Sequence, residues 1–328
     1  MTDREILRKV AATEPGGKTV KGYDIISIED LNDQQIQEVL SLAAQMKAAP
    51  ERYRHTLAGR SMCMLFEKPS LRTRVTFEVG IASLGGYAVY MGPTDVALGK
   101  REAVEDVARN LDRWVDLIVA RVFAHRTLET LAKYSQAPVI NALSDIEHPC
   151  QALADIMTIF EHKGRFAGVK CVFIGDANNV CNSLFLVGSR LGMKLAQGGP
   201  KDYQMNADLL KTIQANASKS GGSITICEDP IEAIRDADVV YTDIWTSMGQ
   251  ESQKHNKDRA FEGYQVNTDL MVHAKPDAIF MHCLPAHRGE EVTSEVLDSP
   301  QSVVFDQAEN RLHAQKALIL KVLGGDIG

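Results

Sequence analysis

Short apolar runs alternate with helical segments along this chain, and that alternation most strongly constrains its fold. The runs cover residues 62–66, 87–91, 117–122 and 139–143 in the first half, then 171–174, 224–227, 239–242, 279–284 and 303–305 in the second. Short continuous apolar strands separated by helices are typical of parallel sheets with helices on both faces. The sequence therefore predicts an α/β fold of doubly wound parallel sheets.

The length of the chain predicts two such domains. Its 328 residues exceed what a single hydrophobic core usually organises. A helix is expected over residues 148–163, and we place the domain boundary along it. The last periodic segment, residues 308–323, predicts a second helix that returns to the first domain. The predicted parts are a first domain (1–150), a second domain (151–308) and a C-terminal helix (309–328), with helices joining the domains.

Charge and composition exclude several classes of function. The net charge is −7 with no basic run, so nucleic acid is not the expected partner. Residues 1–18 are charged and lack the apolar core of a signal peptide, and no apolar stretch approaches the roughly 20 residues of a membrane span. Six cysteines form no CxxC pair, and several lie in apolar runs. We therefore expect a cytoplasmic protein that does not bind membranes.

The stretch Glu67–Arg74 combines features of an anion-binding site. Pro69 and Ser70 indicate a helix start, because proline disfavours helix at the preceding residue and serine caps free backbone N–H groups. A helix N-terminus attracts anions through its unpaired N–H donors. Arg72 and Thr73 add side-chain donors at the same place. The alternative is an ordinary capped helix with solvated arginines.

Two further candidates follow strands of the first half. Arg121 lies within an apolar run, where a guanidinium needs either a buried ion pair or a ligand. His148 and Gln151 begin the helix over 148–163, and their three-residue spacing places them on one face. The histidine can polarise or protonate a bound group, and the glutamine offers both a donor and an acceptor. The alternative for His148 is a structural, hydrogen-bonded histidine.

The segment Gly175–Val180 lies where a dinucleotide-binding fingerprint would be found. Only one of the three required glycines is present, and the next strand-like region ends in Gln197-Gly198-Gly199 instead of a ribose-binding acid. A nucleotide-linked dehydrogenase is therefore disfavoured. Asn178 and Asn179 either cap the following helix or face a polar small molecule.

Asp243 follows the run 239–242, and a carboxylate at a strand end suits recognition of an amino group. The stretch from Ser247 and Met248 to Asp258 indicates a mobile flap, with a plain surface loop as the alternative.

Cys283, beside an aspartate from a neighbouring strand, could bind or deprotonate an amine. Nucleophilic Cys–His catalysis is disfavoured, since His282 and Cys283 would point to opposite faces of a strand. No His or Cys pair here has zinc-ligand spacing, so a zinc site is not expected.

Six of these motifs, in order between Phe66 and Arg311, resemble the aspartate/ornithine carbamoyltransferase family and, within it, the ornithine carbamoyltransferases. The resemblance assigns carbamoyl phosphate binding to Ser70, Leu71, Arg72, Thr73, Arg121, His148, Gln151, Leu284 and Arg311. It assigns ornithine binding to Asn179, Asp243, Ser247 and Met248. The catalytic residues that it implies are Arg72, His148, Asp243 and Cys283.

The resemblance implies that carbamoyl phosphate and L-ornithine give L-citrulline and phosphate in arginine biosynthesis, without a metal or cofactor. It also implies a homo-oligomer, a trimer or a multiple of trimers. Three places depart from the family pattern: Leu71 replaces a frequent threonine, Ala286 and His287 precede Arg288 where some members have the arginine at once, and Ala97 replaces a residue that some members present to a neighbouring subunit. The alternatives are a sister enzyme acting on acetylornithine, putrescine or aspartate, and a non-catalytic ligand-binding protein.

Overall fold

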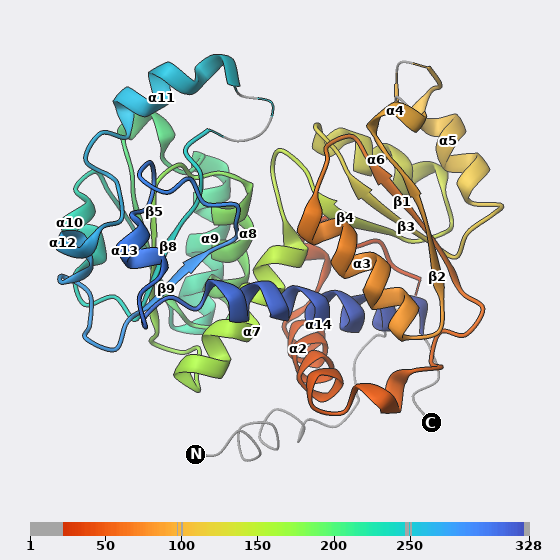
Figure 1. Cartoon of the computed structure of the whole chain (residues 1–328), viewed down its shortest axis with the longest axis horizontal. Helices are drawn as coiled ribbons and strands as arrows, with labels where there is room; N and C mark the ends of the chain where they lie inside the picture. The colour runs from red at the N-terminus through yellow and green to blue at the C-terminus, as the bar shows by residue number, and fades with distance from the viewer. Residues whose placement is uncertain (1–21, 97, 100, 247–248, 250, 325–328) are drawn as a thin grey trace. The chain divides into compact units, whose positions relative to one another are not determined.

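The computed structural model describes residues 22–96, 98–99, 101–246, 249 and 251–324, which form two compact units (Figure 1). The chain changes unit between Met157 and Thr158 and again between Ala308 and Glu309. Each change falls inside a long helix, α7 (Pro149–Lys163) or α14 (Val304–Leu323). Both units contain an all-parallel sheet with helices, which confirms the predicted α/β class. Within the described ranges, no helix is long and apolar enough to cross a membrane.

The first unit contains a four-stranded sheet with the order β2-β1-β3-β4. Its strands are β1 (Ser61–Phe66), β2 (Tyr87–Met91), β3 (Leu117–Arg121) and β4 (Val139–Leu143), within one residue of the predicted bounds. The chain adds β2 beside β1, then places β3 on the other side of β1 and continues outward to β4. The carboxyl ends of β1 and β3 therefore form a topological switch point, where open α/β sheets bind ligands.

Helices bury the central strands of this sheet. α5 (Val104–Leu111) and α6 (His125–Tyr134) pack against one face, which carries Cys63 and Ile118. The alternate residues Met64 and Val119 are fully buried on the other face. α3 (Leu71–Ser83) approaches α14 closely at Gly80, where an added Cβ would lie 3.3 Å from Lys316 Cγ. The remaining helices of this unit are α2 (Asp33–Ala48), α4 (Pro93–Val96) and the 3-10 helices η1 (Ile28–Asp30) and η2 (Pro50–Tyr53).

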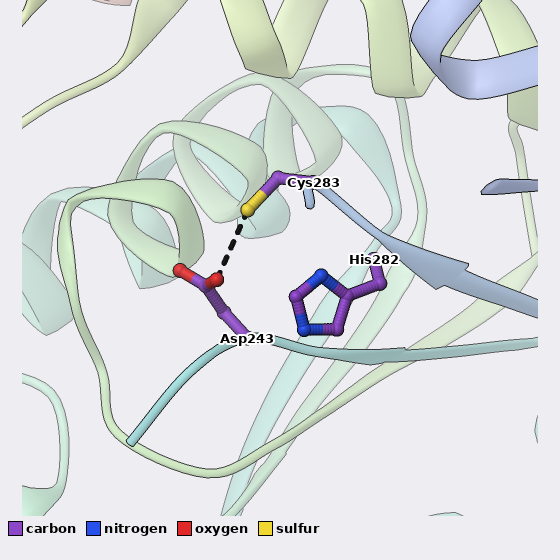
Figure 2. Close-up of side chains that lie close together, drawn as sticks. All are labelled: Asp243, His282 and Cys283. Atoms are coloured by element: carbon purple, nitrogen blue, oxygen red, sulfur yellow. Dashed lines mark hydrogen bonds between the residues drawn. The ribbon is translucent and has the colours of Figure 1, made fainter. Parts of the chain in front are cut away.

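The second unit contains a five-stranded sheet with the order β7-β6-β5-β8-β9. Its strands are β5 (Lys170–Ile174), β6 (Lys194–Gly198), β7 (Ser223–Cys227), β8 (Val239–Thr242) and β9 (Ile279–His282). The order reverses between β5 and β8, so their carboxyl ends form a second switch point. The residues that follow β8 and β9 bring the side chains of Asp243 and Cys283 together there (Figure 2).

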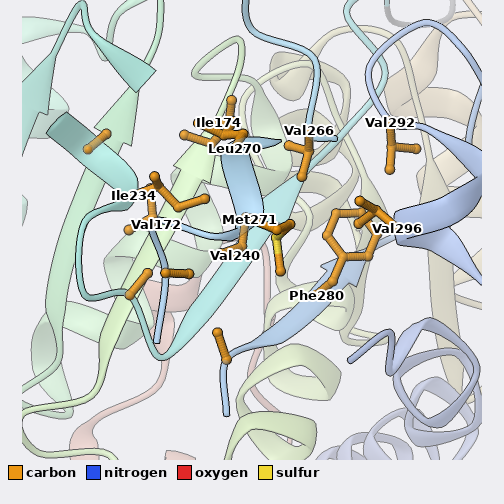
Figure 3. Close-up of a cluster of buried hydrophobic side chains, with 14 of the residues drawn as sticks. Val172, Ile174, Ile234, Val240, Val266, Leu270, Met271, Phe280, Val292 and Val296 are labelled. Atoms are coloured by element: carbon orange, nitrogen blue, oxygen red, sulfur yellow. The ribbon is translucent and has the colours of Figure 1, made fainter. Parts of the chain in front are cut away.

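A core of buried apolar side chains supports one face of this sheet (Figure 3). Val172, Val240 and Phe280 contribute from the strands. Ile234 contributes from α10 (Pro230–Ile234), and Leu270 contributes from α12 (Thr268–Met271). The helices of this unit are α8 (Asn179–Arg190), α9 (Ala207–Ser220), α10 (Pro230–Ile234), α11 (Lys254–Ala260), α12 (Thr268–Met271), α13 (Ser294–Leu297) and the 3-10 helices η3 (Lys201–Tyr203) and η4 (Glu251–Gln253).

The structure corrects two predicted strands. Residues 303–305 are not a strand, because α14 begins at Val304 and only Ser302 forms an isolated bridge, to Phe280. A run of three apolar residues is too short to show the periodicity that would distinguish a strand from the start of a helix. The strand predicted over 279–284 ends at His282, and Leu284 has a positive φ of 59°, which a β-strand excludes.

Candidate active-site residues in the two units

The turn after β1 forms a capped helix start at the first switch point. Ser70 is the N-cap of α3, and its Oγ accepts a hydrogen bond from the Thr73 backbone N–H at 3.2 Å. The Leu71 side chain is 73% exposed, so this residue offers the turn its backbone and not its side chain. Thr73 is buried, and Arg72 is half-buried beside it. The positive end of the helix dipole at this first turn favours an anion.

A buried network joins three of the predicted residues from three helices. Arg311 of α14 donates through Nη1 to Gln151 Oε1 at 2.5 Å and through Nη2 to Thr73 Oγ1 at 3.2 Å. All three side chains are at most 2% exposed. A buried guanidinium is costly unless its donors are satisfied. This network therefore fixes Arg311 against the first turn of α3 and the first turn of α7.

Two supporting residues were not predicted from the sequence. Asp155 accepts a hydrogen bond from Gln151 Nε2 at 2.8 Å, and Gln315 Oε1 accepts one from Arg311 Nε at 3.2 Å. Each lies four residues after its partner on the same helix. A polar pair at i and i+4 within an apolar helix is a signal that the sequence does contain. These contacts set the side-chain directions of Gln151 and Arg311.

His148 is held in its neutral form. Its pKa is well below the ordinary 6.5, first because the ring is buried and then because Arg311, Arg121 and Arg72 carry positive charge nearby. Arg121 is the last residue of β3 and is buried. Three guanidiniums therefore lie close enough to this imidazole for their charge to act on it. Such a cluster can bind a dianion and donate hydrogen bonds to it.

The second switch point carries a carboxylate with three donors. Asp243 Oδ1 accepts from Cys283 Sγ at 3.0 Å and from the Ile244 backbone N–H at 2.8 Å. Its Oδ2 accepts from Asn178 Nδ2 at 2.7 Å. Figure 2 shows the Cys283 thiol pointing at this carboxylate. The structure thus brings together Asp243 and Cys283, as the sequence predicted for two neighbouring strands.

Asn178 takes the capping role that the sequence left open for the asparagine pair, and it also contacts Asp243. Its Oδ1 caps α8 by accepting from the N–H groups of Val180 and Cys181, while its Nδ2 holds Asp243. Asn178 was not among the predicted site residues. The neighbouring Asn179 is the first residue of α8 and is half-exposed.

The position of His282 corrects a prediction. Nitrogen, sulfur and carboxylate atoms of His282, Cys283 and Asp243 lie within 4.8 Å of one another, although the two strand neighbours were expected on opposite faces. The alternation fails because the strand ends at His282 and the chain turns directly afterwards, at Leu284.

The same three residues offer a possible metal-ligand set, but the protein already uses their donor atoms. His282 Nδ1 accepts from the Leu284 backbone N–H at 2.8 Å, and Nε2 lies 3.2 Å from Glu291 Oε1. The Cys283 thiol donates to Asp243. A metal ion here would have to displace at least one of these hydrogen bonds. A second group of candidate ligands is His287, Glu290 and Glu291.

Three residues singled out from the sequence lie outside the described residues: Ser247, Met248 and Ala97. The segment that resumes after them continues into η4 and α11, where Lys257 pairs with Asp176 at 2.6 Å.

Doubly wound sheets with polar clusters at both switch points are typical of two-domain α/β enzymes that bind small molecules. Two family models match this chain. The carbamoyl-P binding domain of aspartate/ornithine carbamoyltransferase matches residues 23–161, and the Asp/Orn binding domain matches residues 167–322. The chain therefore belongs to the aspartate/ornithine carbamoyltransferase family.

Its relatives include ornithine carbamoyltransferases. The enzyme of that name from Thermococcus kodakarensis is 50% identical over 312 residues, which are 94% of this chain and 98% of the relative. An anabolic ornithine carbamoyltransferase from Pyrococcus furiosus is 50% identical over the same shares of the two chains. A solved structure of ornithine carbamoyltransferase from Pyrococcus furiosus matches with a TM-score of 0.91, 50% identity, and coverage of 94% of this chain and 100% of that one.

Proposed function

We propose that this chain transfers the carbamoyl group of carbamoyl phosphate to L-ornithine, giving L-citrulline and phosphate, as a step in arginine biosynthesis. The observation that carries the proposal is the buried contact of Arg311 with Gln151 and Thr73, beside a neutral His148 and two further arginines. Carbamoyl phosphate is a small dianion with a planar amide, and this cluster supplies both cations and amide-complementary groups. The family models add support, since the carbamoyl-P model covers this unit.

The first unit is proposed to bind carbamoyl phosphate. Ser70, Leu71, Arg72 and Thr73 hold the phosphate at the helix start, with Arg121 and Arg311 as further cations. Arg72, Thr73 and His148 polarise the carbonyl oxygen. Because His148 is neutral, it acts as a hydrogen-bond donor and not as a proton source. Gln151 Oε1 has a second lone pair beyond the one that Arg311 occupies, and it orients the carbamoyl amine together with the Leu284 backbone.

The second unit is proposed to bind ornithine. Asp243, Asn179, Ser247 and the Met248 backbone recognise its α-amino and α-carboxylate groups. The δ-amine has an ordinary pKa near that of lysine, about 10.4, so it must lose a proton before it attacks the carbonyl carbon. Asp243 and Cys283 steer this amine, and either Asp243 or a phosphate oxygen takes the proton. Attack forms the C–N bond, the C–O bond to phosphate breaks, and phosphate leaves with both bonding electrons.

No step in this scheme calls for a metal or redox cofactor. Holding two substrates in attack geometry can itself contribute about 7–11 kcal/mol, and the guanidiniums stabilise charge on the leaving phosphate. The cytoplasmic location expected from the sequence, and the homotrimer that the family resemblance implies, belong to the same proposal. The location is supported by six cysteines that are all free thiols.

The test is colorimetric detection of the ureido product from carbamoyl phosphate, with ornithine, acetylornithine, putrescine and aspartate assayed in parallel. Product with ornithine alone is expected. Product with a different amine would agree with carbamoyl phosphate binding in the first unit, but it would overturn the assignment of ornithine to the second unit. Absence of product with all four amines would overturn the enzyme proposal in favour of a binding protein.

A further inference from the structure

The ring of His282 connects two parts of the turn after β9. Its Nδ1 lies 2.8 Å from the backbone nitrogen of Leu284, and its Nε2 lies 3.2 Å from Glu291 Oε1. Both side chains are fully buried. Glu291 Oε1 also accepts the backbone N–H of His287 at 2.6 Å, so the carboxylate is anchored in the loop that follows the turn. No role in the scheme above uses either residue.

These contacts determine the tautomer of His282. A backbone N–H can only donate, so the Nδ1 that faces Leu284 must carry a lone pair. The proton of the neutral ring is therefore on Nε2, where it is donated to the Glu291 carboxylate. Turning the ring over would place carbon atoms against both partners and lose both hydrogen bonds. The same contacts exclude His282 as a base for the Cys283 thiol, because neither ring nitrogen has a lone pair left for it.

The backbone that His282 holds has an unfavourable conformation. Leu284 has a φ of 59°, in the left-handed region that residues with a side chain rarely adopt. A residue with a side chain keeps this backbone conformation only where contacts with its surroundings stabilise it. The hydrogen bond from its N–H to His282 is one such restraint. A second restraint lies before the turn, where the His282 backbone N–H donates to Gln307 Oε1 at 3.0 Å.

We propose that His282 is a positioning residue whose Nδ1, with its tautomer fixed by Glu291, holds the turn that presents Cys283 to Asp243 and sets the direction of the Leu284 backbone. The inference rests on the proposed function, in which Cys283 and the Leu284 backbone meet the substrates. His282 itself touches neither substrate. Its contribution is the geometry of the two residues that follow it.

Two substitutions separate this role from a merely structural one. His282→Asn places its amide oxygen near the position of Nδ1, so the acceptor for the Leu284 N–H is kept and the donor to Glu291 is lost. His282→Gln places its amide near the position of Nε2, so it keeps a donor for Glu291 and loses the acceptor for Leu284. His273→Asn, at an exposed position of the same unit, is the matched control.

We expect His282→Gln to lower kcat by about 10²-fold, the effect of a small misplacement of reacting groups. His282→Asn should recover most of that loss, although it leaves the buried Glu291 carboxylate without its donor from the ring and should therefore lower the thermal midpoint more than His282→Gln does. Equal kcat values in the two variants, or losses that follow the thermal midpoint, would overturn the proposal. The control should match the unsubstituted enzyme.

A second measurement needs no variant. In ¹⁵N-labelled protein the proposal predicts a coupling through the hydrogen bond between the Leu284 amide proton and a histidine Nδ1 that carries no proton. A protonated Nδ1 at this site would overturn the inference whatever the variants show. If the unsubstituted chain makes no citrulline, the proposed function fails in the activity assay, whereas this spectrum still tests the tautomer on its own.

Discussion

At the scale of single residues, burial and neighbouring charge decide what each polar side chain can do. His148 and Arg72 show this most clearly, because burial, and after it the arginines that favour a bound anion, lower the pKa of the imidazole. A protonated His148 would add a fourth cation to the cluster. The neutral ring instead offers one donor that can be directed at a carbonyl oxygen.

We expect Arg72→Ala to reduce kcat/KM for carbamoyl phosphate by about 10²–10³-fold, because a donor to the developing negative charge is lost. The fold should be unchanged, as judged by circular dichroism. Arg74→Ala is the matched control two residues along α3, where the exposed side chain pairs with Glu78 at 3.2 Å. Near-normal turnover in Arg72→Ala would refute the assignment of Arg72 to the anion site.

Asp243→Asn should raise KM for ornithine far more than it affects carbamoyl phosphate. The amide keeps the shape of the side chain but loses the charge that attracts an amine, and it weakens the hydrogen bond from Cys283. Steady-state kinetics with each substrate varied in turn measure the two effects. The exposed Asp269→Asn serves as the control. Equal losses for both substrates would contradict the assignment of Asp243 to the ornithine subsite.

At the scale of secondary-structure elements, close backbone contacts position the turns that carry the candidate residues. Gly199 follows β6, and a Cβ there would lie 2.5 Å from the Gly175 carbonyl oxygen. Gly175 begins the turn that leads to Asn178. The absence of a side chain at Gly199 therefore allows the turn after β5 to lie where Asn178 can hold Asp243.

Gly199→Ala should lower the free energy of unfolding by about 1–3 kcal/mol, the usual cost of forcing atoms into a packed site. Because Gly175 must move, the KM for ornithine should also rise. Urea unfolding and steady-state kinetics report the two effects. Lys201→Ala, at an exposed position of the same loop, should change neither. A variant as stable as the original chain would show that the turn after β5 adapts without cost.

The sequence predicted the strands of the first sheet accurately, but it failed for one short apolar run and for the end of β9. The four strands of the first sheet were placed within one residue, because each is a short apolar run; β1 and β3 are buried throughout, whereas Tyr87 and Val89 of β2 are exposed. The strand predicted at residues 303–305 was wrong, because over three residues the start of a helix can be as apolar as a strand. The end of β9 was also placed two residues too late. What ends it is the turn at Leu284, and a leucine carries no local signal for a positive φ.

At the scale of the whole molecule, acid should destabilise the protein through buried histidines. The pKa of His148 is lowered in the folded state, whereas the unfolded chain has an ordinary pKa near 6.5. Below pH 6.5 the unfolded state therefore binds a proton that the folded state does not. Stability is then lost as the pH falls, by about 1.4 kcal/mol per pH unit for one such group. The pKa of His313 is lowered in the same direction, chiefly by burial.

His148→Gln should reduce this acid sensitivity between pH 6.5 and 5. Urea unfolding of the substrate-free protein at several pH values, compared with the unsubstituted chain, gives the difference in slope. Above pH 7 the slopes should agree, because a neutral histidine then binds no proton in either state. Parallel curves throughout the acid range would mean that His148 titrates normally in the folded protein.

The sequence by itself determined the fold class and the residue types at the strand ends. Apolar runs and helical periods are local patterns, and burial of each pattern admits few arrangements. Tertiary structure alone decided which side chains meet. Arg311 is 160 residues from Gln151, and Asn178 is 65 residues from Asp243, and neither pair has a local signal. The contact between His282 and Glu291 likewise depends on the turn between them, which the sequence did not predict. Partners are chosen by strand order and helix packing, so they follow from contacts across the fold and not from neighbours in the chain.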